Sequence, residues 1–268
     1  AYSMGQDMDL SLDFVKDTSS FERSDELQYI IQSKIESQKN ILGLIIIQNG
    51  TIISESYYNG SSKESISNIY SVTKSYMSTL IGQAIDKDIM YNVDSSFSKF
   101  IPKKIIDYAD SLTLHNILSL SSGLKDHYQY PSYINQPIDS LLSVELINPG
   151  KFQYSNSATH LNAHALFYAS EMTPHQFASR YLFPYLGIEE PRWDHGYLNI
   201  NDGATNLYLN LRDMVKLGQL YIQNGYSGSN QILSTEWIHK ATKSQVSTDY
   251  VNDPSYSPIY KMIAKLVG

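Results

Sequence analysis

The chain has 268 residues, a hydrophobic content of 42%, a charged content of 18% and a formal net charge of −7. These values are typical of a globular protein with a substantial core; they exclude a disordered chain and give no support to nucleic acid or an anionic membrane as a partner. Because the chain has no cysteine, disulfides, thiolate catalysis and Cys-ligated zinc are excluded.

The N-terminal region contains one predicted helix after a stretch without periodicity, which we expect to wrap the surface. Ser24 is a candidate N-cap, and an apolar stripe after it predicts a helix over 24–38. The chain begins with Ala1-Tyr2-Ser3, as a processed export product does, which favours a periplasmic or secreted protein over a cytoplasmic one. A trimmed chain would begin in the same way.

A β-hairpin is predicted next. Two β-rich runs, 41–47 and 51–58, flank Asn49-Gly50, a pair typical of hairpin turns because both turn positions require positive φ. The first run is also the longest apolar run of the chain, and it is too short to cross a bilayer, so no transmembrane segment is expected.

The segment that begins at Ser71 carries the first candidate for chemistry. Apolar residues follow Ser71 at helical spacing, which predicts a buried helix beginning near it, with Lys74 on the same face. A hydroxyl at a helix N-terminus with a desolvated amine one turn away is the Ser-x-x-Lys arrangement of serine acyltransferases. The pair is also frequent by chance, and the alternative is an N-cap serine beside a solvated lysine, so the choice depends on the rest of the chain.

The rest of the chain is predicted to be mostly helical. Thr113 is a candidate N-cap for a helix that ends with Gly123 as a left-handed C-cap. Further helices are predicted over 158–171, from the capping box at 173–176, from Asn210 to Asn224-Gly225, from Ser234 onward, and over 260–267.

Several motifs follow one another in a specific order: Tyr70-Ser71-Val72-Thr73-Lys74, Leu112-Thr113-Leu114-His115-Asn116 with Ser122-Gly123-Leu124, Tyr154-Ser155-Asn156, and Gly203-Ala204-Thr205-Asn206. In this order and rough spacing the chain resembles the serine β-lactamase and penicillin-binding-protein superfamily over about 42–243. It is most similar to the class C β-lactamase-like branch of esterases, D-amino-acid peptidases and amide hydrolases.

The resemblance implies an α/β (α+β) fold, in which an antiparallel sheet flanked by helices is interrupted by a mostly helical domain. We expect the α/β domain at 1–86 and 200–268 and the helical domain at 87–199, with the active site in the cleft between them. Ser71 is then the acylated nucleophile, Lys74 and Tyr154 share the proton transfers, and Asn156 binds a substrate carbonyl or positions Lys74. The expected substrate is a small or peptide-like ester or amide, and no cofactor is implied.

Several residues have simpler interpretations. Taken alone, Tyr154 is a packed aromatic side chain. His160 and His164 have the spacing of a metal pair, but no third ligand is evident, so a packing or surface role is favoured and no metal is expected. Asp126-His127 is a polar loop next to the cleft, and the segment 193–195 is a candidate substrate-facing loop.

The family's third motif is not found. A Lys-Thr-Gly or His-x-Gly sequence should lie on a strand facing the nucleophile, and no candidate strand follows Lys243. The sheet is therefore expected to be incomplete, and three explanations compete: an internal stretch near 251–256 is missing from the chain, a natural deletion abolished catalysis, or a partner chain completes the sheet. The rival function is a non-catalytic binding or scaffold protein with this fold. The retention of Ser71, Lys74, Tyr154 and Asn156 together favours the first explanation, a missing internal stretch, and with it the hydrolase.

Overall fold

The computed structural model describes residues 29–36, 38–48, 50–102, 110–126, 132–143, 145–189 and 191–247. Its strands pair in three two-stranded antiparallel sheets: β1 (Gly43–Gln48) with β2 (Thr51–Tyr57), β3 (Ser67–Asn68) with β4 (Tyr208–Leu209), and β5 (Tyr226–Ser227) with β6 (Asn230–Gln231). Its helices are α2 (Thr73–Asp86), α4 (Leu114–Leu118), α5 (Ile138–Leu142), α6 (Asn156–Ser170), α7 (Pro174–Tyr181), α8 (Phe183–Leu186), α9 (Leu211–Ile222) and α10 (Thr235–Thr242).

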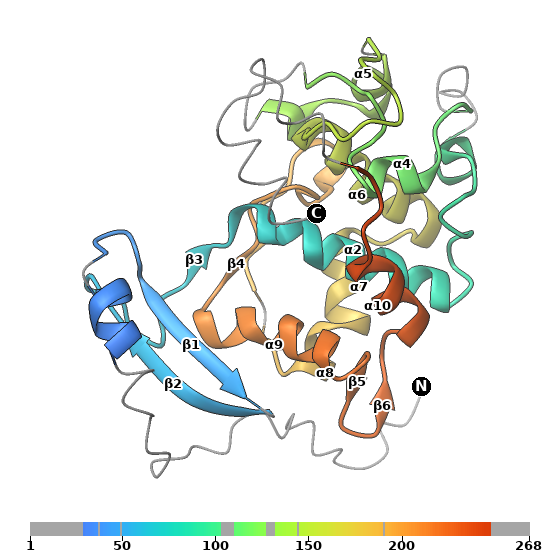
Figure 1. The fold of residues 1–268 in the computed structure, drawn as a ribbon. Helices are drawn as coiled ribbons and strands as arrows, with labels where there is room; N and C mark the ends of the chain where they lie inside the picture. Colours follow the sequence, from blue (N-terminus) through green and yellow to red (C-terminus); the bar gives the residue numbers. More distant parts are fainter. Residues whose placement is uncertain are drawn as a thin grey trace.

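The predicted hairpin is confirmed, and it lies at one side of the helical body (Figure 1). Gly50 has a φ of +76°, the left-handed conformation that the turn requires. Arg212, at the start of α9, binds the carboxylate of Glu55 on β2 through Nε at 2.7 Å and Nη2 at 2.5 Å. This bidentate ion pair fastens the hairpin to α9.

Helix α2 lies at the centre of the helical body, with α6 and α7 packed against it (Figure 1). Its core-facing side chains are fully buried: Tyr76, Met77, Leu80, Ile81 and Ala84. Gln83, also buried, donates from Nε2 to the carbonyl oxygens of Tyr181 at 2.7 Å and Ile232 at 2.9 Å. Burial of this apolar face holds α2 in place, and the helix in turn positions the residues at its N-terminus.

Most predicted helix starts are confirmed by their caps. Thr173, Asn210 and Ser234 each accept a hydrogen bond from the third residue that follows, and Thr173 forms a complete capping box with Gln176. The helix predicted over 158–171 begins two residues earlier, at Asn156, where Ser155 is an N-cap that was not predicted. The other predicted positions, Ser24 and the helix over 260–267, lie outside the described residues. Of the predicted helix over 24–38, the structure describes a helical turn at Ile31–Glu36.

The predicted C-cap of α4 is wrong. Thr113 does form a capping box with Asn116, but the helix ends at Leu118, before Gly123 is reached. Gly123 does have a φ of +75°, but it lies in a loop beyond the helix. A Cβ at this position would lie 2.9 Å from the backbone of Pro149. The glycine therefore serves a close approach of two loops.

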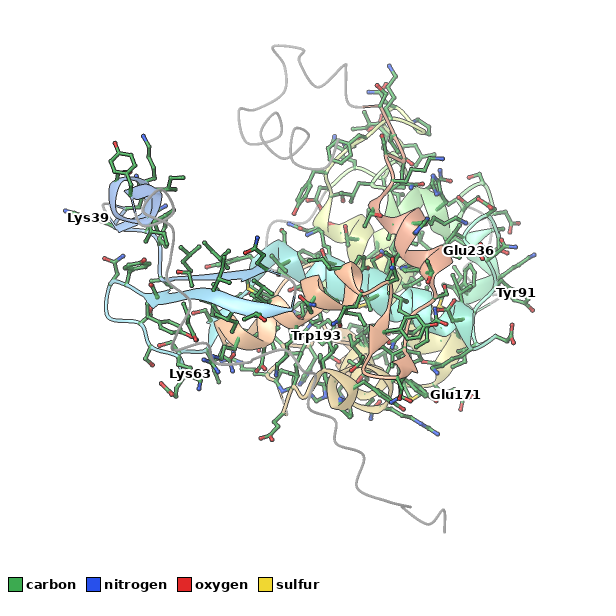
Figure 2. The ribbon with its side chains drawn as sticks, turned by 60° about the horizontal axis from the view of Figure 1, so that its bottom comes forward. Lys39, Lys63, Tyr91, Glu171, Trp193 and Glu236 are labelled. Carbon is green, nitrogen blue, oxygen red and sulfur yellow. The ribbon has the colours of Figure 1, made fainter. Side chains whose placement is uncertain are left out.

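The fold class is confirmed as a mixed α/β protein with short antiparallel sheets packed against helices. Figure 2 shows Trp193 within the helical body and Tyr91 and Glu171 at its periphery. Among the strands of the described residues, none carries a Lys-Thr-Gly or His-x-Gly sequence, so the strand that the resemblance implies is not found in this part of the chain. No helix within the described ranges has the length and apolar character to cross a membrane. The division into 1–86 with 200–268 and 87–199 stays a prediction.

Candidate active site

Ser71 lies in a tight turn that leads into α2. A 3₁₀ turn, Tyr70–Val72, precedes the helix, so α2 begins at Thr73, slightly later than predicted. Tyr70 has a φ of +46°, an uncommon conformation for a non-glycine residue. Its backbone N–H donates to Asn68 Oδ1 at 2.8 Å, which helps to hold this strained turn. The turn leaves Ser71 exposed at the start of a buried helix.

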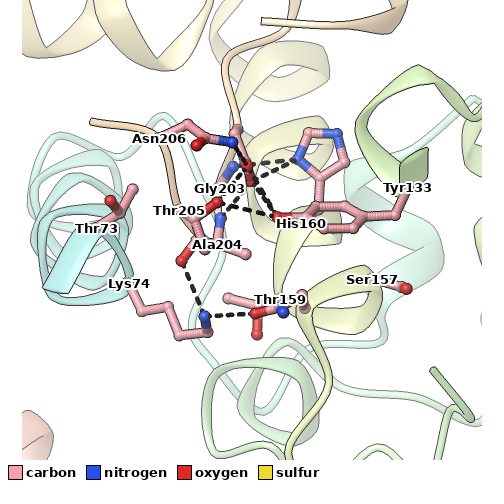
Figure 3. Close-up of polar contacts among 12 residues, drawn as sticks. Thr73, Lys74, Tyr133, Ser157, Thr159, His160, Gly203, Ala204, Thr205 and Asn206 are labelled. Atoms are coloured by element: carbon pink, nitrogen blue, oxygen red, sulfur yellow. Dashed lines mark hydrogen bonds and ion pairs between the residues drawn. The ribbon is translucent and has the colours of Figure 1, made fainter. Parts of the chain in front are cut away.

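Lys74 lies one turn further and reaches three acceptors. Its Nζ donates to Ser71 Oγ at 3.3 Å, to Asn156 Oδ1 at 2.8 Å and to the carbonyl oxygen of Ala204 at 2.9 Å, the last of which is visible in Figure 3. Burial lowers the pKa of the Lys74 amine, because desolvation disfavours its charged form. Tyr154 and the carboxylates Asp202 and Asp126 act against this shift.

Tyr154 completes the group. Its hydroxyl shares a hydrogen bond of 2.5 Å with Ser71 Oγ, and Lys74 Nζ lies 4.8 Å from the centroid of its ring. The structure therefore places both the amine and the phenol within hydrogen-bond reach of the Ser71 hydroxyl. Asn156 is brought to the same point through its bond to Lys74.

The start of α6 positions both Tyr154 and Asn156. Ser155 is the N-cap between them, and its hydroxyl accepts from the backbone N–H of Ala158 at 3.0 Å. Asp126 accepts from the backbone N–H groups of Asn156 at 3.4 Å and Ser157 at 3.2 Å. Asp126 thus supports the helix N-terminus, where a negative charge is favourable. His127, the second residue of this predicted loop, lies outside the described residues.

A cleft of about 770 Å³ opens at Ser71, lined by α2, α9 and the segments around Leu118 and Lys243. Its lining is mostly apolar or hydroxyl-bearing and includes Ser71, Val72, Lys74, Ser75, Leu118, Phe152, Tyr154, Met214, Leu217, Tyr221 and Val246. The segment 193–195 does not line this cleft. Trp193 is buried instead, and its Nε1 donates to the carbonyl oxygen of Asp202 at 2.8 Å.

The two histidines of α6 are core residues. His160 and His164 are fully buried, and their rings meet edge to face at a centroid distance of 4.9 Å. His160 Nδ1 accepts a hydrogen bond from the backbone N–H of Gly203 at 3.1 Å, and burial lowers its pKa to about 3. Within the described part of the chain, no group of three histidine or acidic side chains has a geometry suited to a metal ion.

The turn at 202–206 supports the site although its residue types predict no role for it. The backbone N–H of Gly203 donates to His160, and the backbone carbonyl of Ala204 accepts from Lys74. The block Gly203-Ala204-Thr205-Asn206 was noticeable only as one of the ordered motifs, because a backbone carbonyl leaves no trace in residue type. Contacts of this kind become visible only in three dimensions.

Comparison with known proteins identifies a family. The family model described as Beta-lactamase matches residues 31–261. No curated protein matches the chain significantly.

Solved structures share the fold at low identity. A protein from Bacteroides dorei DSM 17855, provisionally assigned as a beta-lactamase, is 21% identical with a TM-score of 0.69 over 87% of this chain and 72% of its own. A provisional 6-aminohexanoate-dimer hydrolase from Bacillus anthracis is 18% identical, with a TM-score of 0.66 over 75% of this chain. The octameric penicillin-binding protein homologue from Pyrococcus abyssi is 16% identical, with a TM-score of 0.64 over 84% of this chain. The present chain spans 59% and 60% of the length of the last two.

Proposed function

The chain belongs to the beta-lactamase family, and on this premise we propose that it is a serine hydrolase that forms an acyl-enzyme with an ester, amide or peptide-like substrate. The observation that carries the proposal is the convergence of Ser71 Oγ, Lys74 Nζ and Tyr154 OH, with separations of 3.3 Å and 2.5 Å from the serine oxygen. A nucleophile and a proton acceptor at such distances are what acyl transfer requires.

In the acylation step Ser71 Oγ attacks the substrate carbonyl carbon, and its proton passes to Tyr154 or Lys74. The lowered pKa of Lys74 increases the fraction of neutral amine near neutral pH, which suits it to proton transfer. When the carbon–oxygen or carbon–nitrogen bond of the substrate breaks, the same group returns the proton to the leaving alcohol or amine. We expect the backbone N–H of Ser71 to be one donor to the developing oxyanion.

The second step releases the acid. Water attacks the acyl carbon, the Tyr154–Lys74 pair accepts its proton, and the bond to Ser71 Oγ breaks as the serine regains a proton. Asn156 keeps Lys74 directed toward Ser71, and its amide NH₂ is a candidate donor to a substrate carbonyl. The apolar lining of the cleft, including Met214 and Leu217, favours substrates with an apolar group next to the reacting carbonyl.

A non-catalytic binding protein is the second candidate. One observation favours it: the strands of the described residues carry no third motif, and that strand would supply the second oxyanion donor in the family. Such a protein would bind an ester or amide ligand in the same cleft without turning it over.

The decisive experiment combines a fluorophosphonate probe with a chromogenic acyl ester. We expect intact mass to show one adduct, peptide mapping to place it on Ser71, and Ser71→Ala to abolish both labelling and ester turnover. Ser143→Ala is the matched control, because Ser143 is exposed and bonds only locally to Ser140. Absence of an adduct on folded protein, with ligand binding unaffected by Ser71→Ala, would establish the binding protein instead.

A further inference from the structure

The carboxylate of Asp202 is buried beneath the active site and is not part of the proposed chemistry. It has no exposed surface, and both of its oxygens accept hydrogen bonds. Oδ1 accepts from the backbone N–H of Ala204 at 2.8 Å, and Oδ2 accepts from Thr205 Oγ1 and Asn206 Nδ2, each at 2.8 Å. The hydroxyl of Tyr133 bonds both oxygens, at 3.0 and 2.8 Å. The carboxylate thus closes the turn 202–206 on itself.

The first consequence concerns Lys74. The N–H of Ala204 is held by Asp202, and the carbonyl of the same residue accepts from Lys74 Nζ at 2.9 Å. Gly203 is fixed on its other side by His160, and a Cβ at this glycine would lie 3.1 Å from Ala163. The carbonyl that binds the amine therefore sits on a turn anchored from two directions.

The second consequence concerns the strained backbone before Ser71. Asn206 Nδ2 donates to Asp202, and Asn206 Oδ1 accepts from Asn68 Nδ2 at 2.9 Å. Asn68 Oδ1 then accepts from the backbone N–H of Tyr70 at 2.8 Å. A chain of two amide side chains thus connects the carboxylate to the residue that precedes Ser71.

The direction of this chain is fixed at both ends. A backbone N–H can only donate, so Asn68 must present its oxygen to Tyr70 and its NH₂ to Asn206. An ionised carboxylate can only accept, so Asn206 must present its NH₂ to Asp202 and its oxygen to Asn68. The two requirements agree only if an acceptor occupies the position of Asp202 Oδ2.

We propose that Asp202 is a positioning residue for the acylation step, holding the Ala204 carbonyl against Lys74 and, through Asn206 and Asn68, the backbone of Tyr70 that presents Ser71. The inference rests on the proposed hydrolase function. The negative charge of the Asp202 carboxylate also favours the protonated form of Lys74. Asp202 therefore influences the amine both by positioning its acceptor and by its electrostatic field.

Asp202→Asn is the test because it keeps the volume and removes one acceptor. The new NH₂ must face either the N–H of Ala204 or the NH₂ of Asn206, and both are obligate donors. If the new NH₂ faces the N–H of Ala204, the two donors repel and the turn moves its carbonyl away from Lys74. If it faces Asn206, the side-chain amides of Asn206 and Asn68 must both flip, and the N–H of Tyr70 loses its acceptor. We expect Ser71 to be phosphonylated by the fluorophosphonate, with loss of fluoride, about 10–100-fold more slowly, because misplacement of the nucleophile by about 1 Å has effects of this size.

The pH profile separates positioning from a merely structural role. Loss of a charge that raises the pKa of Lys74 should move the acidic limb of the acylation profile to lower pH, whereas a smaller fraction of folded protein would leave the limb in place. Asp194→Asn is the matched control, since Asp194 pairs with Arg192 at the surface and does not line the cleft. A folded Asp202→Asn protein with the wild-type acylation rate and an unmoved limb would overturn the proposal.

A second variant keeps the test decisive if Asp202→Asn does not fold. Asn68→Ala, at a half-buried position, removes the bonds of this amide to Asn206 and to Tyr70 and leaves the bonds of Asp202 to Ala204 and Thr205 in place. We expect roughly tenfold slower acylation with an unmoved acidic limb. A wild-type rate in Asn68→Ala together with unfolded Asp202→Asn would reduce Asp202 to a stabilising residue and reject the proposal. Labelling of Ser71 in the wild-type protein tests the hydrolase function separately.

Discussion

Lys74 and Asn156 are separated by 82 positions in the chain, yet Lys74 Nζ donates to Asn156 Oδ1 at 2.8 Å. The bond joins the first turn of α2 to the first residue of α6. Because α2 and α6 pack directly against each other in the core, the contact is set by the burial of two helices.

Replacement of Asn156 by aspartate should change the pH dependence of activity. A carboxylate at this position would stabilise the ammonium form, raise the pKa of Lys74 and move the acidic limb of kcat/KM to higher pH. The profile measured with a chromogenic ester tests this expectation. Asn148→Asp, an exposed site with a positive φ that aspartate tolerates, adds the same charge away from the cleft and should leave the limb in place.

Removal of the Tyr154 hydroxyl should affect chemistry more than stability. Tyr154→Phe keeps the ring beside Lys74 but deletes the group bonded to Ser71, so we expect acylation to slow by about 10²–10⁴-fold. Stopped-flow labelling and thermal unfolding measure the two effects independently. Tyr91→Phe, at a 62% exposed site, serves as the control. An unchanged rate in Tyr154→Phe would remove the phenol from the mechanism.

The buried histidines predict a loss of stability in acid. Burial holds the pKa of His160 at about 3 and that of His164 well below its usual range, so below pH 6.5 the unfolded chain binds more protons than the native one. Stability is then present near pH 7 and is lost as the pH falls from 6.5 toward 3. The pKa shift of His160 alone should lower the free energy of unfolding by about 2–3 kcal/mol between pH 7 and pH 4.5. Asp202, whose pKa is raised by burial, acts in the opposite direction.

The contribution of one histidine can be isolated by substitution. Among the described residues, neither ring nitrogen of His164 has a hydrogen-bond partner. The substitution His164→Leu therefore leaves no described polar group without a hydrogen bond that it had before. We expect a shallower decline of urea-unfolding free energy between pH 7 and pH 4.5 in this variant. His239→Leu, on the exposed face of α10, should retain the wild-type slope. Equal slopes in His164→Leu and wild-type protein would contradict the assignment.

Two glycines inside helices should respond oppositely to alanine. A Cβ at Gly82 of α2 would lie 2.6 Å from the indole ring of Trp237, so Gly82→Ala should destabilise the protein by about 1–3 kcal/mol through overpacking. A Cβ at Gly218 of α9 has no neighbour within 4 Å, so Gly218→Ala should stabilise by up to about 1 kcal/mol through helix propensity. Chemical unfolding of both variants measures the difference. Stabilisation by Gly82→Ala would mean that α10 packs elsewhere.

The sequence predicted features that depend on local physics. The hairpin around Gly50, the caps at Thr113, Thr173 and Ser234, and the buried face of α2 all arise from φ preferences, side-chain hydrogen bonds or helical periodicity. The end of α4 was mispredicted because a left-handed glycine can serve a close approach of loops as readily as a C-cap.

Ser71 and Lys74 were selected from the sequence by residue type and helical spacing, and Tyr154 and Asn156 by the resemblance of the ordered motifs to a family. Only the tertiary structure decided that these groups meet, that burial lowers the pKa of Lys74, and that the carbonyl of Ala204 and the carboxylate of Asp202 support them. The physical reason is that hydrogen bonds across 82 or 130 positions depend on the packing of whole helices. A backbone carbonyl, moreover, is common to every residue, so the chain's letters alone cannot distinguish the one that binds the amine.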